Sequence, residues 1–389
     1  MRFIHLADLH IGKRINEFSL LEDQTYILDK IVEITEKETA DAVIIAGDLY
    51  DKSVPPGEAV PVLDDFLTRL SEMDKTVFII SGNHDSSERL SFGSRLLKKS
   101  NIHIISTFEG SLSKTVLKDD YGNINIFALP FVRPARVQKY FPDKTISSYE
   151  DAIVEIINDA KDKRILVPNE RNILICHQFV TGTSSPILSD SESTIVGTLE
   201  NISYEIFDDF DYVALGHLHC PQSVGRDTIR YAGSPLKYSF SEVNHKKSVT
   251  IVDIDKSMVT LKVSPLNPTR DMRKIKGKLE NLISPEVCEE VCNDFIHATL
   301  TDENDIYEPL ATLRAYYPYI LHMEHIKESE FSNENNNISV YDRINKNPVE
   351  LFKEFYEEIK QEEFDVQKQK LLEKLLKEEG LEEFCHDTH

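Results

Sequence analysis

Side chains that can bind metal ions stand at the ends of five apolar segments of the sequence. The five motifs are Asp8-Leu9-His10, Gly47-Asp48-Leu49-Tyr50-Asp51, Gly82-Asn83-His84-Asp85, His177 and Gly216-His217-Leu218-His219. One such motif alone is most often a turn or a helix cap. Five of them, all rich in oxygen and imidazole groups and none using cysteine, are not explained by turns. Such ligands suit Mn²⁺, Fe²⁺ or Zn²⁺ with positions open to water, whereas a structural zinc site prefers thiolates.

The number of candidate ligands predicts how many ions they hold. Seven ligands are too many for one ion and suit two ions that share a bridging carboxylate. Two ions about 3.5–4 Å apart lower the pKa of a bridging water and clamp the oxygens of a phosphate during in-line attack. The motifs therefore predict hydrolysis of a phosphoester by activated water, with two divalent ions as cofactors, and we expect Mn²⁺.

Short apolar segments precede these motifs and are typical of strands. We expect strands at 2–7, 42–46, 76–81, 102–106, 124–130, 173–176, 212–215 and 248–254, and helices at 22–38 and 59–73. Several of the strands are continuous apolar runs, as in sheets that are covered on both faces. The helices are long enough for parallel crossovers. The pattern predicts an α/β fold, a layered β-sandwich with flanking helices.

The residue pattern of the sequence changes after Pro265, which predicts further domains. We expect a domain at 1–265, a small α+β capping domain at 266–331, a polar linker at 332–347 and a helical tail at 348–389. The tail carries one apolar face, formed by Leu371, Leu372, Leu375 and Leu376. This face could pack on the protein itself or lie in the groove of a partner, and we favour the partner.

Composition excludes several classes of protein. The 389 residues are 40% hydrophobic and 29% charged, which excludes a wholly disordered or fibrous chain. No run approaches the roughly 18 apolar residues that cross a bilayer, so we expect no membrane contact. Five cysteines form no disulfide framework, and the cytoplasm fits best. The net charge of −23 argues against DNA as a partner, although bound cations would offset a cluster of carboxylates.

Basic residues near the motifs leave two interpretations open. They could contact phosphates of DNA, or they could be ordinary surface charges. The residues concerned are Lys13, Arg14, Lys52, Arg89, Lys246 and Lys247, together with His245.

The order of the five motifs resembles that of the calcineurin-like metallophosphoesterases. Four further segments resemble the SbcD family within that superfamily, which supplies the nuclease subunit of bacterial SbcCD complexes. These segments are Ala7-Asp8-Leu9-His10-Ile11-Gly12, Ser53-Val54-Pro55-Pro56, Gly197-Thr198-Leu199 and Ala232-Gly233-Ser234-Pro235. The likeness is close over about residues 1–260.

The resemblance implies a role for each site residue. One ion would be held by Asp8, His10, Asp48 and His219, and the other by Asp48, Asn83, His177 and His217, so that Asp48 bridges the two. His84 would face the scissile phosphate and stabilise developing charge or protonate the leaving oxygen. Asp51 would orient His84, and Asp85 is a second candidate for a supporting role.

The resemblance also implies an activity and partners. We expect a nuclease that degrades ends of duplex DNA and cuts single strands or hairpins. Its ATP dependence would come from an SbcC ATPase subunit, because no nucleotide-binding glycine-rich loop appears in this sequence. The resemblance also implies that the chain forms a homodimer within a heterotetramer. The alternative is a metallophosphoesterase that acts on nucleotides, cyclic nucleotides or phosphoproteins.

Overall fold

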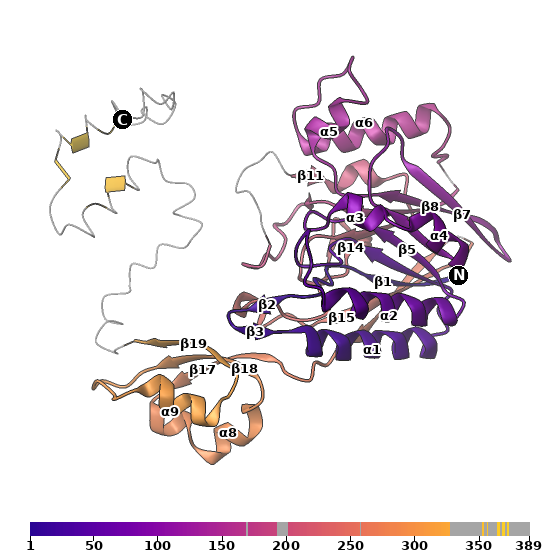
Figure 1. Cartoon of the computed structure of the whole chain (residues 1–389). Coiled ribbons are helices and arrows are strands. Elements are labelled where there is room, and N and C mark those ends of the chain that lie inside the picture. The colour runs from indigo at the N-terminus through magenta and orange to yellow at the C-terminus, as the bar shows by residue number, and fades with distance from the viewer. Residues whose placement is uncertain are drawn as a thin grey trace. The chain divides into compact units, whose positions relative to one another are not determined.

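The structure is a computed structural model that describes residues 1–168, 170–192, 201–256 and 258–326, and single residues between 352 and 372. The chain divides into two compact units (Figure 1). The first comprises residues 1–300 and 306–325, and the second comprises residues 301–305 and 326–389. In the second unit, the ring of Phe364 contacts the rings of Phe352 and Tyr356.

The first unit contains a six-stranded sheet with strand order β16-β15-β1-β4-β5-β6. Its strands are β1 (Arg2–Leu6), β4 (Ala42–Ala46), β5 (Thr76–Ile80), β6 (Ile102–Ile105), β15 (Ser248–Ile254) and β16 (Val259–Pro265). The strands β1, β4, β5 and β6 run parallel, and β15 pairs antiparallel with β1. The carboxyl ends of β1, β4 and β5 therefore meet at one edge of this sheet.

A second six-stranded sheet has the order β13-β14-β12-β9-β8-β7. Its strands are β7 (Ser113–Asp119), β8 (Gly122–Leu129), β9 (Arg171–His177), β12 (Tyr212–Gly216), β13 (Gln222–Val224) and β14 (Arg226–Tyr231). The neighbours β8, β9, β12 and β14 are parallel. This sheet brings the carboxyl ends of β9 and β12 together.

The two sheets pack face to face between two layers of helices. Buried side chains of both sheets, among them Phe3, Phe78, Ile126 and Ile175, form the core between them. The helices α1 (Leu21–Lys37) and α2 (Ala59–Glu72) pack on the outer face of the first sheet. The helices α5 (Pro134–Gln138) and α6 (Tyr149–Asp162) cover the second sheet (Figure 1). The predicted layered β-sandwich with flanking helices is confirmed.

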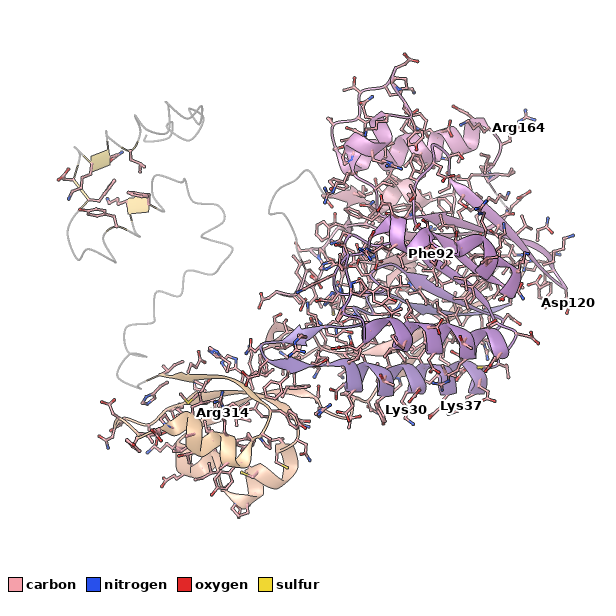
Figure 2. The ribbon with its side chains drawn as sticks, viewed as in Figure 1. Lys30, Lys37, Phe92, Asp120, Arg164 and Arg314 are labelled. Carbon is pink, nitrogen blue, oxygen red and sulfur yellow. The ribbon has the colours of Figure 1, made fainter. Side chains whose placement is uncertain are left out.

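The helix α1 shows why these segments fold as they do. Its apolar residues recur with helical spacing, and Ile27, Leu28 and Ile31 are buried against the first sheet. Burial of each such side chain is worth roughly 1.5–3 kcal/mol. Lys30 and Lys37 lie on the side of the helix away from this core, as Figure 2 shows.

A smaller parallel sheet lies in the C-terminal part of the first unit. It consists of β17 (Met272–Gly277), β18 (Phe295–Leu300) and β19 (Ile320–His325), in that order. The helices α7 (Leu279–Leu282), α8 (Pro285–Val291) and α9 (Pro309–Tyr316) share a small core with one face of this sheet. The ring of Phe18 contacts Phe295 and Tyr319, so this sheet is packed against the larger part of the same unit.

Short elements connect these layers. They are β2 (Arg14–Ile15), β3 (Phe18–Ser19), α3 (Ser87–Ser91), α4 (Ser94–Leu97), β10 (Val180–Thr181), β11 (Ile202–Ser203) and the 3₁₀ helices η1 (Lys98–Ser100), η2 (Tyr204–Phe207) and η3 (Phe240–Glu242). Among the described residues, none of the helices has the length and apolar character needed to span a bilayer.

Some predictions concern residues outside the described ones. These are the segment 197–199, the linker at 332–347 and the tail leucines 371, 375 and 376. The predicted boundaries at residues 265, 331 and 347 stay predictions.

Candidate metal centre

Every motif lies at the carboxyl end of a parallel strand. Asp8 and His10 follow β1, Asp48 follows β4, and Asn83 with His84 follows β5. The second sheet supplies His177 at the end of β9, and His217 and His219 after β12. The structure therefore brings together residues that are up to 211 positions apart in the sequence. They meet where the carboxyl ends of strands from both sheets lie next to each other.

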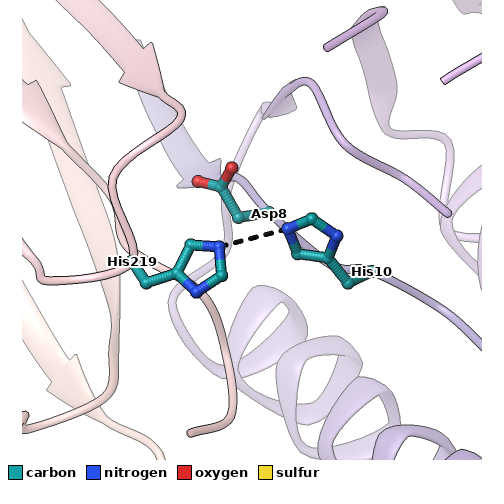
Figure 3. Close-up of side chains that lie close together, drawn as sticks. All are labelled: Asp8, His10 and His219. Carbon is teal, nitrogen blue, oxygen red and sulfur yellow. Dashed lines mark hydrogen bonds between the residues drawn. The ribbon is translucent and has the colours of Figure 1, made fainter. Parts of the chain in front are cut away.

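Asp8, His10 and His219 form one group of potential ligands (Figure 3). Nε2 of His10 lies 3.1 Å from Nε2 of His219. One ligand atom from each of the three residues lies within 4.8 Å of the others. All three side chains are buried, so a cation between them would replace water as the partner of the carboxylate.

Asp48 lies between this group and a second one. Its Oδ2 is 3.7 Å from Nε2 of His10 and 3.4 Å from Nε2 of His177. Oδ1 of Asn83 lies 3.0 Å from the same nitrogen of His177 and 3.1 Å from Nδ1 of His217. One carboxylate oxygen thus faces ligands of both groups, which is the position that a bridging ligand requires.

Hydrogen bonds on the far side of two imidazoles orient their metal-facing nitrogens. Nδ1 of His177 donates to the carbonyl oxygen of Ala46 at 2.7 Å. Nδ1 of His219 faces Oε1 of Glu242 at 3.1 Å. Since a carbonyl or carboxylate only accepts, each Nδ1 carries a hydrogen, which leaves Nε2 as the nitrogen that can face a metal.

The backbone at this edge takes an unfavourable conformation. Asp8, His10 and Asp48 have φ values of 54°, 44° and 51°. Left-handed conformations in residues other than glycine cost of order 1–3 kcal/mol each and gather at functional sites. The strain turns these side chains toward a common point instead of letting the strands continue.

Two glycines of the motifs permit the close approach of the ligands. A Cβ atom at Gly82 would lie 2.1 Å from Oδ1 of Asp48. A Cβ atom at Gly216 would lie 1.9 Å from the carbonyl oxygen of Ala46, on a strand of the other sheet. The glycine that begins the Gly-Asn-His and Gly-His sequences is thus needed because no Cβ atom fits there, in addition to the chemistry of the ligands that follow it.

The pKa values of the cluster indicate a site built for cations. Burial and the neighbouring Asp48 carboxylate raise the pKa of Asp8 to about 7. Burial lowers the pKa of His177, but Asp48 and Asp8 outweigh it and raise that pKa to about 9. Burial lowers the pKa of His217 to about 3 and that of His10 well below its usual value. The buried carboxylates of Asp8 and Asp48 thus share His177 as their positively charged neighbour, while His10 and His217 have lowered pKa values. Carboxylates and neutral imidazoles together are a donor set that fits divalent cations.

His84 and its neighbours lie beside this group. The backbone N–H of His84 donates to Oδ1 of Asp48 at 2.9 Å, and its ring is 4.8 Å from the ring of His10. Nδ1 of His84 faces the backbone carbonyl oxygen of Asp51 at 2.9 Å. Asp51 thus contacts His84 through its main chain, while its carboxylate binds Nζ of Lys13 at 2.7 Å. The carboxylate of Asp85 instead accepts bonds from three backbone N–H groups, those of Leu49, Tyr50 and Gly82.

The sequence interpretation missed a buried ion pair behind His219. Glu242 is fully buried in η3, and its Oε2 accepts a bond from Nζ of Lys247 at 2.6 Å. The same Nζ donates to the carbonyl oxygen of His219 at 2.8 Å. Both interpretations of Lys247, a phosphate contact or a surface charge, are therefore wrong, because its ammonium group is buried with three acceptors. No motif marks Glu242, so its position could be found only in three dimensions.

A family comparison assigns a class to this fold and site. Residues 1–221 match the calcineurin-like phosphoesterase family, and residues 268–360 match the type 5 capsule protein repressor C-terminal domain. The class is that of metal-dependent phosphoesterases.

Curated relatives narrow the class. The chain is 37% identical over 329 residues to the SbcD subunit of nuclease SbcCD from Staphylococcus epidermidis, covering 84% of this chain and 86% of the relative. It is also 37% identical over 323 residues to the corresponding SbcD subunit from Staphylococcus saprophyticus, covering 82% and 84%. The chain belongs to the SbcD family of calcineurin-like phosphoesterases. A dimetal phosphatase from Danio rerio aligns with 69% of this chain and 96% of its own at a TM-score of 0.40 and 11% identity, a likeness too weak to support an inference.

Proposed function

We propose that this chain is a metal-dependent DNA nuclease of the SbcCD type. It hydrolyses phosphodiesters at the ends of duplex DNA and within single-stranded or hairpin DNA. The observation that carries the proposal is the convergence of two ligand groups on one carboxylate, Asp48, in a chain whose relatives are named as the SbcD subunit of nuclease SbcCD. Two ions that share a ligand suit in-line attack on a phosphodiester.

The proposal assigns the ligands as the motifs predict. Asp8, His10, Asp48 and His219 hold one ion, and Asp48, Asn83, His177 and His217 hold the other. When bound, the two ions, which we propose to be Mn²⁺, activate the attacking water and neutralise charge on the phosphate. All of these ligands are buried except Asn83, which is half-buried.

His84 handles the proton in this proposal. Because its Nδ1 faces the carbonyl oxygen of Asp51, that nitrogen keeps a hydrogen and Nε2 is the atom free to exchange a proton. The protonated ring stabilises developing negative charge and delivers the proton of Nε2 to the leaving oxygen. Asp51 acts as a positioning residue, since it holds the ring in place through its backbone.

The proposal includes partners. An SbcC ATPase subunit supplies ATP-dependent action on DNA, and the chain works in the cytoplasm as a homodimer within a heterotetramer. A homodimer is supported by an apolar hollow that Phe92 (88% exposed; Figure 2) and Val60 (47%) line together with Leu90 and Leu97. Such a surface is unfavourable in water unless it is covered.

A substrate panel tests the proposed activity. The purified chain is assayed with Mn²⁺ on linear duplex DNA, hairpin DNA and bis-p-nitrophenyl phosphate. Cleavage of both DNA substrates is expected, and cleavage of the small ester alone would contradict a nuclease.

The variant His84→Ala tests the division of labour within the site. We expect it to keep both metal equivalents and to lose about 10²–10⁴-fold in kcat, the usual contribution of a general acid. His103→Ala is the control, because that half-buried histidine stacks on Phe78 in the first sheet and touches no site residue that the structure describes. Loss of metal in His84→Ala would make His84 a ligand instead.

A further inference from the structure

Two imidazoles and a carboxylate meet on the small parallel sheet, away from the motifs of the catalytic site. They are His297 on β18 and His322 and Glu324 on β19. The register places His322 opposite His297 and Glu324 opposite Thr299, after an irregularity between Ile296 and His297. Residues two apart on a strand share a face, so all of these side chains lie on one side of the sheet.

The distances within this cluster suit a common ligand. One ligand atom of each of His297, His322 and Glu324 lies within 4.8 Å of the others. The two imidazole rings are 4.5 Å apart between centroids and nearly perpendicular, with an interplanar angle of 80°. Nε2 of His297 lies 3.5 Å from Oε1 of Glu324.

One buried nitrogen of the cluster makes only a long contact. Water does not reach Nε2 of His297, and among the described residues its contact with Oε1 of Glu324, at 3.5 Å, does not have the geometry of a hydrogen bond. A buried polar atom without a partner costs about 1–3 kcal/mol. By contrast, Glu324 is held in place, because Oγ1 of Thr299 donates to its Oε1 at 2.6 Å. The cluster therefore has a fixed carboxylate next to a nitrogen that makes no well-formed hydrogen bond.

The local electrostatics keep these groups in the form that binds metals. Burial, His322 and Lys274 lower the pKa of His297 although Glu324 raises it, which favours the neutral imidazole. The hydrogen bond from Thr299 lowers the pKa of Glu324, so its carboxylate is ionised. Lys274 is the neighbour of His297 on β17 and repels cations, but it is exposed and its ammonium group can stay in water.

We propose that His297, His322 and Glu324 form a further divalent metal site, distinct from the catalytic pair. Two imidazoles and one carboxylate without thiolates favour Zn²⁺ or a similar transition metal over Ca²⁺ or Mg²⁺. Three protein ligands leave a position for water or another oxygen ligand. The site does not depend on the proposed nuclease activity.

The position of this site connects it physically to the catalytic centre. The ring of His297 packs edge-on against Phe240, with the centroids 5.3 Å apart. Phe240 begins the 3₁₀ helix η3, whose last residue, Glu242, holds Nδ1 of His219. The cluster therefore packs against the short helix that carries Glu242, while its own three side chains are not among the catalytic ligands.

Metal counting in the full-length chain tests the site. The chain is stripped with a chelator and equilibrated with Zn²⁺, and its metal content is measured by mass spectrometry. We expect His322→Ala and Glu324→Gln each to bind one Zn²⁺ fewer per chain than the wild type. His103→Ala, which alters another half-buried strand histidine, should bind as much as the wild type. An unchanged zinc content in His322→Ala would overturn the proposal.

A second experiment separates the site from the catalytic pair. In the background of Asp48→Ala, which removes the bridging carboxylate, we expect a zinc equivalent that disappears when His322→Ala is added. His322→Ala alone should keep Mn²⁺-dependent phosphodiesterase activity on bis-p-nitrophenyl phosphate within about 2-fold, because His322 contacts no ligand of the catalytic pair that the structure describes. A large loss of that activity together with the zinc equivalent would place the lost metal in the catalytic centre and overturn the proposal.

Discussion

The catalytic edge of the two large sheets and the small parallel sheet collect metal-binding side chains in different ways. At the catalytic edge the ligands come from loops after strands, with left-handed φ values at Asp8, His10 and Asp48 and buried partners behind His177 and His219. On the small sheet, His297 and His322 come from within two adjacent strands; His297 is partly exposed and His322 is exposed to water. Strain, burial and supporting bonds make the first site rigid, so we expect tighter and more cooperative binding there than on the small sheet.

The largest effect is expected from Asp48→Asn. This change weakens a ligand that faces both groups, so both catalytic ions should be lost and kcat should fall by at least about 10³-fold, since even one electrostatic stabiliser is commonly worth 10²–10³. Metal analysis and steady-state assays with Mn²⁺ measure the two effects. Asp64→Asn, at an exposed position of α2, is the control. Retention of both ions in Asp48→Asn would show that the carboxylate does not bridge them.

Glu242→Gln tests the support behind His219. It leaves the buried ammonium group of Lys247 without its carboxylate, so the free energy of unfolding should fall by about 3 kcal/mol. Metal affinity should fall by about 10–100-fold, as is usual when a bond behind a metal-ligating histidine is lost. Urea unfolding with a chelator and metal titration give the two numbers. Glu324→Gln on the small sheet, with its partly exposed side chain, should leave stability nearly unchanged.

The double variant Glu242→Leu/Lys247→Met separates charge from geometry. Removing both charges should restore most of the stability, because neither buried charge is left alone. It should not restore metal affinity, because His219 still lacks an acceptor for Nδ1. Recovery of both quantities would mean that Glu242 serves folding only.

Gly216→Ala tests the contact between the two sheets. Its Cβ atom would lie 1.9 Å from the carbonyl oxygen of Ala46, so the strands must separate, at a cost of about 1–3 kcal/mol for overpacking. The matched control is Gly277→Ala in β17, where the nearest atom to the new Cβ is Cδ2 of Leu282 at an ordinary 3.5 Å. We expect unfolding curves of Gly277→Ala to stay within about 0.5 kcal/mol of the wild type. Equal losses in both variants would argue against a tight junction at Gly216.

The smallest effect concerns α6, which lies outside both metal-binding regions. Asp151 completes a capping box with Ser148, and hydrogen bonds from Ser147 and Ser148 lower its pKa to about 2. Asp151→Ala should reduce stability by about 1 kcal/mol at neutral pH. Because the pKa of Asp151 is lowered in the folded state, its carboxylate stabilises the fold at pH values above the ordinary pKa of 3.8. The difference in unfolding free energy between the wild type and Asp151→Ala should therefore vanish as the pH falls through about 2. Unfolding of both proteins between pH 2 and 7 measures it, and metal content should not change.

Much of the fold could be predicted because the local signals agreed with the tertiary structure. The runs at 42–46 and 248–254 became β4 and β15 with the expected bounds, since continuous β-branched segments fit a core between two sheets. The helix α6 and the strands β7 and β14 were not predicted. Their patterns are weaker, and packing against the second sheet decides their conformation.

The candidate site shows the same limit. Motif residues could be found because chemistry requires their types at strand ends, and the structure brings them together. The backbone carbonyl oxygen of Asp51 contacts Nδ1 of His84. Any residue has such a carbonyl, so the sequence pattern could not predict that this contact is made by the main chain. Glu242 and Lys247 could not be recognised either, because a buried ion pair looks like two surface charges until the surrounding chain is placed.

The division of the ligands between two sheets has a consequence for the newly made protein. The first sheet carries Asp8, Asp48 and Asn83, but His217 and His219 emerge from the ribosome more than 130 residues later. A nascent chain that has formed only the early strands holds an incomplete set of donors and cannot yet cut nucleic acid. A complete ligand set therefore requires strands of the second sheet that are synthesised late.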